Sequence, residues 1–127
     1  MTESLTITIP LQTVSESNGR GLTRGAAIAK SSRIKRQRLT ITQYLHADGI
    51  APAHWLSLAP LTVGLVRISP YRLDDDNLRG ALKSTRDAVA AWLGIDDRDS
   101  RVQWDYAQRR GAVREQAISI TFTRSTP

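Results

Sequence analysis

The chain has 127 residues, of which 40% are hydrophobic, which allows one domain with its own core and leaves no room for a second. Cysteine is absent, which excludes disulfides and thiolate metal sites. Eighteen Lys and Arg against twelve Asp and Glu give a net charge of +6, which favours a polyanionic partner. Residues 1–10 lack the pattern of a signal peptide and no run approaches a membrane span, so we expect a cytoplasmic protein.

The first part of the chain predicts a strand, a loop and a helix. Residues 5–10 alternate between apolar and polar side chains, which is typical of a strand, and end at a proline. Residues 11–25 have the Ser, Asn and Gly content of a flexible loop. A helix is predicted from Ser31 or Ser32 to about residues 48–49. Basic residues of this loop and helix are expected to contact DNA phosphates: Arg20, Arg24, Lys30, Arg33, Lys35, Arg36 and Arg38.

The second part predicts the clearest elements. Residues 50–60 form a connection around a tryptophan, and residues 61–68 predict a mostly buried strand. The apolar spacing of residues 78–93 predicts one long amphipathic helix. Residues 102–106 and 118–122 alternate and predict an antiparallel hairpin. The chain, residues 1–127, is therefore expected to be a single α+β domain with a small mixed or antiparallel sheet of about four strands packed against two helices.

Two acidic clusters flank the long predicted helix. Residues 74–77 (DDDN) precede it, and residues 96–99 (DDRD) follow it. Hard carboxylate oxygens suit Mg²⁺ or Mn²⁺, and such an ion lowers the pKa of bound water and polarises a phosphate without a side-chain nucleophile. We therefore expect a phosphodiesterase site in which Asp74, Asp76 and one aspartate of the second cluster hold the ion. The competing interpretation is that the acids only cap a helix and solvate two loops.

With these elements in order, the sequence resembles the RusA family of Holliday junction resolvases. Residues 72–78 (RLDDDNL) resemble the family's Asp-x-Asp-Asn-Leu motif, with Asp74 and Asp76 as the pair. Residues 93–97 (LGIDD) resemble its second acidic motif. The similarity follows the order and spacing of most of the chain, and it is specific only over residues 61–106.

The resemblance implies a homodimeric, Mg²⁺-dependent endonuclease. Such a hydrolase acts in DNA recombination and repair in a bacterial cell, encoded by the host or by a phage, and makes paired cuts in four-way DNA junctions. Two alternatives stay open. One is a DNA-binding accessory protein without catalysis, and the other is a nuclease that acts on other branched DNA, such as flaps or forks.

The family usually has a functional lysine one helical turn past the second motif aspartate, where this chain has Gly80. We take Lys83 as the corresponding catalytic cation, because it lies on nearly the same helical azimuth as Asp76, and we keep Arg79 as the alternative.

The second cluster contains an extra acid, so its register is open. The Asp-Asp doublet favours Asp97 as the third ligand, whereas the distance from the strand residue Val102 favours Asp99. Asn77 either forms a hydrogen bond at the helix start or orients a ligating carboxylate, and we favour the second role. Four more arginines are expected to contact DNA: Arg72, Arg79, Arg109 and Arg110.

Overall fold

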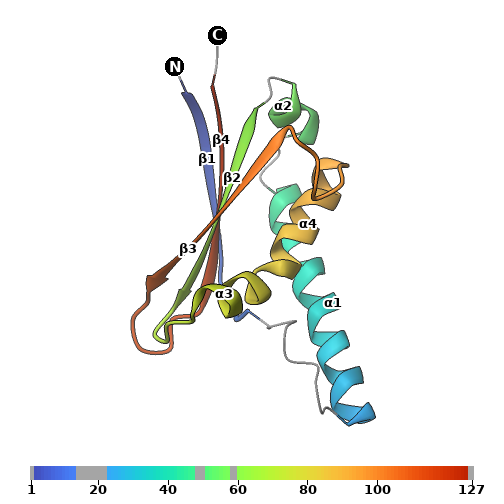
Figure 1. The fold of residues 1–127 in the computed structure, drawn as a ribbon, viewed down its shortest axis with the longest axis vertical. Helices are drawn as coiled ribbons and strands as arrows, with labels where there is room; N and C mark the ends of the chain where they lie inside the picture. The colour runs from blue at the N-terminus through green and yellow to red at the C-terminus, as the bar shows by residue number, and fades with distance from the viewer. Residues whose placement is uncertain (1, 14–22, 48–50, 58–59, 126–127) are drawn as a thin grey trace.

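The computed structural model describes residues 2–13, 23–47, 51–57 and 60–125, which form one sheet with helices on one of its faces (Figure 1). In chain order the elements are β1 (Thr2–Ile9), α1 (Arg24–Ala47), α2 (Pro52–Leu56), β2 (Leu61–Ser69), α3 (Asp75–Ala81), α4 (Lys83–Leu93), β3 (Val102–Arg110) and β4 (Ala117–Ser125). The expected α+β class and four-stranded mixed sheet are confirmed. The described residues form four helices, where the sequence predicted two.

The strand order in the sheet is β1-β4-β2-β3. Strand β4 pairs antiparallel with both β1 and β2, whereas β2 and β3 are parallel, in register from Leu61↔Val102 to Ser69↔Arg110. The predicted hairpin between β3 and β4 is therefore wrong, because β2 lies between them. Parallel neighbours need a long crossover connection, and α3 and α4 provide it between β2 and β3.

The core lies between the sheet and the helices, and it follows from the alternation of each strand. Alternate residues of β2 and β4, such as Val63, Leu65 and Phe122, are fully buried against the helices. Trp55 of α2 is also buried, as predicted, and its ring stacks on Phe122 with centroids 5.5 Å apart. The opposite face of the sheet presents small polar side chains, including Thr6, which is hydrogen-bonded to Thr121.

Helix α1 begins at Arg24, earlier than predicted. The hydroxyl oxygen of Thr23 accepts a hydrogen bond from the backbone N–H of Ala26 at 3.1 Å, so Thr23 caps the helix in place of the predicted serines. Residues 52–56 of the predicted connection form the short helix α2, which starts at a proline. Within the described part of the chain, none of these helices is both long enough and apolar enough to cross a membrane.

The long helix predicted over residues 78–93 is broken at Leu82, whose φ of −97° and ψ of 2° separate α3 from α4. The apolar stripe continues across the break, since Leu78, Leu82 and Val89 are all buried, and periodicity alone does not reveal it. Asp76 belongs to α3 and Lys83 to α4, so, contrary to the prediction, the two residues do not share the azimuth of one continuous helix. The end of α4 is as predicted, because Gly94 adopts the left-handed conformation with φ of 77°.

Candidate functional site

The first acidic cluster forms the start of α3. The side-chain oxygen Oδ1 of Asp74 accepts a hydrogen bond from the backbone N–H of Asn77 at 2.9 Å, so Asp74 is the N-cap of the helix. Asp75 and Asp76 are exposed in the first turn, where the partial positive charge of the helix end offsets their negative charge. The contacts of this cluster are therefore those of a capped helix start.

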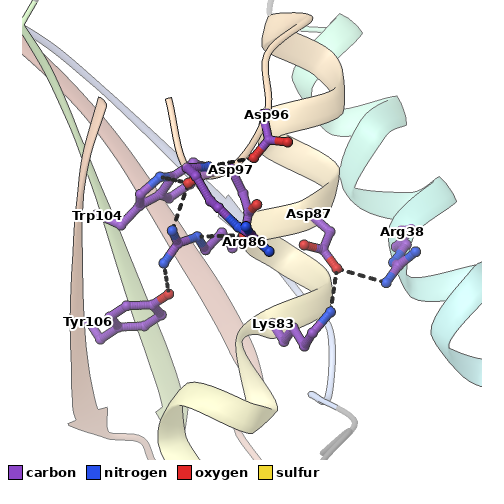
Figure 2. A network of polar contacts seen from close by, with 9 residues as sticks. Arg38, Lys83, Arg86, Asp87, Asp96, Asp97, Trp104 and Tyr106 are labelled. Atoms are coloured by element: carbon purple, nitrogen blue, oxygen red, sulfur yellow. Dashed lines mark hydrogen bonds and ion pairs between the residues drawn. The ribbon is translucent and has the colours of Figure 1, made fainter. Parts of the chain in front are cut away.

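The second acidic cluster is tied to the sheet by Arg86 of α4, as Figure 2 shows. The guanidinium Nε of Arg86 lies 3.4 Å from Oδ2 of Asp97, and its Nη2 donates to the backbone carbonyl of Asp97 at 2.7 Å. Its Nη1 donates to the hydroxyl of Tyr106 at 2.7 Å, and its charge lies over the ring of Trp104. The indole N–H of Trp104 donates to the same Asp97 carbonyl at 3.1 Å. Asp97 thus has a cationic partner within its own chain.

Asp99, the alternative third ligand, has a different cationic partner. The guanidinium of Arg101 donates to both of its carboxylate oxygens, at 3.1 and 2.8 Å. These hydrogen bonds and a further one from the Arg101 backbone N–H lower the pKa of Asp99 to about 2. The side chain of Asp96 accepts a hydrogen bond from the backbone N–H of Arg98 at 2.8 Å.

The predicted catalytic cation Lys83 lies on another side of α4. Its Nζ is 3.0 Å from Oδ2 of Asp87, which Arg38 of α1 also contacts at 2.9 Å. Figure 2 shows these three side chains on the side of α4 that faces α1, whereas Arg86 points towards β3. The structure therefore does not bring Lys83 to the Asp97 loop.

The four predicted ligands do not fit a shared cation site as they are placed. Across residues 2–13, 23–47, 51–57 and 60–125, no three His, Asp or Glu side chains are grouped so that they could hold one metal ion. Magnesium at Asp74, Asp76, Asp97 or Asp99 stays a prediction.

Three of the predicted phosphate-binding residues do come together, at the carboxyl ends of the parallel strands β2 and β3. There they border a hollow of about 290 Å³, which we call the arginine hollow. It is lined by Ser69, Pro70, Tyr71, Arg72, Gln108, Arg109 and Arg110. Arg72 is far in sequence from Arg109 and Arg110, and the register that pairs Ser69 with Arg110 brings the two segments together.

One wall of the arginine hollow is the segment after β2, and side-chain hydrogen bonds fix its backbone before and after Arg72. The side-chain amide of Gln108 bonds both backbone groups of Leu73, accepting from its N–H at 3.0 Å and donating to its carbonyl at 2.7 Å. The guanidinium of Arg67 donates to the carbonyl of Tyr71 at 2.5 Å, and the hydroxyl of Ser69 accepts from the N–H of Tyr71 at 3.2 Å. The backbone on both sides of Arg72 is therefore fixed.

Arg67 is itself unusual, because its side chain is buried behind the arginine hollow with 9% relative exposure. Burial lowers its pKa from the ordinary value. Its hydrogen bonds go to the Tyr71 carbonyl and to the hydroxyl of Thr13 at 3.3 Å, and no acidic residue in the described ranges forms an ion pair with it. Within the described part of the chain, this buried cation therefore contributes positive potential at this end of the sheet.

Sequence reasoning missed Arg67, Ser69, Tyr71 and Gln108 as parts of this site. The available signal was the length of the connection between β2 and β3. A connection of that length is typical of a crossover between two parallel neighbouring strands. That pairing places the two strand ends together, and without it these residues have no reason to meet.

The other predicted DNA contacts are distributed differently. Arg24, Lys30, Arg33, Lys35 and Arg36 all belong to α1. Arg79 of α3 lies over the ring of Tyr106, with its guanidinium carbon 5.0 Å from the ring centroid. Arg20 lies outside the described residues.

Comparison with known proteins gives no family for this chain. No family model matches the sequence, and no curated protein matches it either. Among solved structures, the chain is similar to a protein of unknown function of the conserved Rid protein family, YyfB from Yersinia pestis. That likeness has a TM-score of 0.38 and 15% sequence identity, and covers 95% of this chain and 78% of the other. At this level it transfers neither a fold nor an activity.

The predicted membership of the RusA family is wrong, because no family model matches the sequence and no curated protein matches it. Nothing found points to a Holliday junction nuclease. The predicted roles of a nuclease in junction resolution, recombination and repair fall with it. Binding to DNA was also predicted from the net charge of the chain, and it stays a prediction. The homodimer was inferred from the same resemblance and stays a prediction.

Proposed function

We propose that the protein binds a nucleic acid through the phosphates of its backbone, with the arginine hollow as the principal contact. The observation that supports this most strongly is that Arg72, Arg109 and Arg110 all line one hollow. Guanidinium groups bind phosphate oxygens with two parallel hydrogen bonds, which makes a cluster of them well suited to a phosphate chain. The hollow also lies beyond the carboxyl ends of parallel strands, where open α/β sheets commonly bind ligands.

Helix α1 supplies a second basic surface. Its 24 residues contain no Asp or Glu. Among its six basic side chains Arg38 is paired with Asp87, and the other five form no ion pair with an acidic residue in the described ranges. Figure 1 shows the first turns of α1 at the same end of the molecule as α3 and the β3–β4 connection. Phosphates bound in the arginine hollow would therefore continue towards a helix of the same charge.

The proposal is tested by the salt dependence of nucleic-acid binding. Each phosphate contact contributes about 0.7 to 0.9 to the slope of log affinity against log salt concentration. We expect a steep slope for the wild-type protein, measured by fluorescence anisotropy with a labelled oligonucleotide. In the combined variant Arg72→Gln, Arg109→Gln and Arg110→Gln, we expect weaker binding and a slope smaller by about 2 to 3.

The matched control is Arg98→Gln. Arg98 is exposed and precedes β3, at the opposite end of that strand from Arg109 and Arg110. Its replacement removes a positive charge without touching the arginine hollow, so its slope should stay close to that of the wild-type protein. If the combined variant binds with the wild-type affinity and slope, the proposed function is wrong.

A further inference from the structure

We infer that the arginine hollow takes a single-stranded nucleic acid, with one unstacked base on the ring of Tyr71 and the adjoining phosphates on Arg72, Arg109 and Arg110. This inference rests on the proposed function and specifies its substrate class. It starts from an aromatic side chain that has no packing role. Tyr71 is 72% exposed, yet it lines the hollow together with Arg72, Arg109 and Arg110.

The position of Tyr71 is fixed by its backbone and not by its side chain. Its N–H and its carbonyl are bound by Ser69 and Arg67, and Pro70 before it restricts the chain further. Folding thus holds the backbone of this tyrosine still while leaving most of its side chain exposed. A ring held in this way loses little conformational entropy when a base stacks on it.

The buried charge of Arg67 supports an anionic ligand at the same place. Arg67 forms no ion pair with an acid in the described ranges, and a desolvated guanidinium in that position is costly. Part of that cost is recovered when an anion binds nearby. Arg67 donates a hydrogen bond to the carbonyl of Tyr71, which lines the hollow. Its positive charge therefore lies close to the hollow. The site therefore combines an apolar ring with positive charge, as single-strand binding sites do.

The size of the hollow distinguishes a single strand from a duplex. A volume of about 290 Å³ is enough for part of one nucleotide and much smaller than a double helix. Bases inside a duplex are stacked on one another and present only their edges, whereas a single strand can turn a base out onto an aromatic ring. The duplex can offer the hollow its phosphates but not the face of a base.

The test compares a thymidine oligonucleotide with a duplex of the same length, using the wild-type protein and Tyr71→Leu. We expect the wild-type protein to prefer the single strand. Tyr71→Leu should weaken single-strand binding by about tenfold, the effect of losing one stacked base, and leave duplex binding unchanged. Tyr71→Trp, which keeps an aromatic face, should retain the preference. Tyr44→Leu, which removes an exposed tyrosine from α1, is the matched control and should bind as the wild-type protein does.

The outcomes separate this inference from the proposed function. If Tyr71→Leu binds both oligonucleotides as the wild-type protein does while the combined arginine variant loses both, the single-strand inference is overturned and backbone binding stands. If the arginine variant also binds normally, the proposed function itself fails. Because Tyr71 is exposed, we expect its variants to fold, which circular dichroism checks directly.

Discussion

Gln108 of β3 and Leu73, 35 residues earlier in the chain, are joined by two hydrogen bonds from one side-chain amide. Leu73 lies beyond the end of β2 at Ser69, so its backbone is not paired with a neighbouring strand. The Gln108 amide satisfies its N–H and its carbonyl instead. It fixes the backbone immediately after Arg72 and immediately before the cap residue Asp74. One side chain therefore sets both the wall of the arginine hollow and the approach to α3.

Replacing Gln108 with leucine should loosen this wall. We expect Gln108→Leu to lower the free energy of unfolding by about 2 kcal/mol, because each of the two hydrogen bonds contributes about 1 kcal/mol. Urea denaturation measures this directly. The control is Gln103→Leu on the same strand. Its side chain is exposed and, among the described residues, bonds only Asp105, so the change should cost less than about 0.5 kcal/mol. Equal losses in the two variants would contradict the special role of Gln108.

Replacing Arg67 should separate binding from stability. A buried charge exchanged for an apolar side chain of similar length often leaves stability unchanged or raises it, so we expect Arg67→Met to unfold at a urea concentration no lower than the wild-type protein. Its affinity for a nucleic acid should fall by about fivefold to tenfold, because Tyr71 loses a hydrogen bond and the hollow loses positive charge. An unchanged affinity would show that Arg67 does not act on the hollow.

Arg86 is expected to contribute more to stability than Arg79, which also contacts Tyr106, because Arg86 forms hydrogen bonds as well as a ring contact. Arg86→Leu removes the contacts with Asp97 and Tyr106 and leaves the Asp97 carboxylate without its partner, so we expect a loss of about 2 to 4 kcal/mol in chemical denaturation. The control Arg79→Leu removes only the stacking on Tyr106 and should cost about 1 kcal/mol or less. A smaller loss for Arg86→Leu than for Arg79→Leu would refute this assignment.

The ion pair of Asp99 with Arg101 should make stability depend on pH at the acid end. The pKa of Asp99 is about 2 in the folded protein, below the usual value near 3.9, so its contribution is fully present above that usual value. It is lost as the pH falls through the folded pKa. A carboxyl NMR titration should show this low pKa, and Arg101→Gln should raise it towards the usual range. A normal pKa for Asp99 in the wild-type protein would mean that the pair does not form in solution.

Much of the secondary structure follows from local patterns in the sequence. Strands β1 and β2 and the stop of α4 at Gly94 were predicted because alternation and a left-handed glycine are local properties. The parallel pairing of β2 with β3 was not, since alternation within one strand does not say which strand lies beside it. The break at Leu82 was also hidden, because the buried stripe passes through it unchanged.

The candidate site was predictable only in part, for a related reason. Arg72, Arg109 and Arg110 were predicted to contact phosphates from their charge, but their convergence depends on the sheet register. The acidic clusters were predicted to bind a metal from their carboxylates alone, and the sequence did not show the partners that these carboxylates have in the structure. Asp97 finds Arg86, 11 residues earlier, and Asp74 bonds the backbone of Asn77.

The most direct measurement of the central claim is an NMR titration of the isotope-labelled protein with a single-stranded oligonucleotide. Binding in the arginine hollow predicts that the amide signals of Ser69, Tyr71, Arg72, Arg109 and Arg110 shift together and saturate at one affinity. Thr6 and Thr121, on the face of the sheet away from the helices, should not shift. If those threonines shift and the hollow residues do not, the nucleic acid binds elsewhere and the account is wrong.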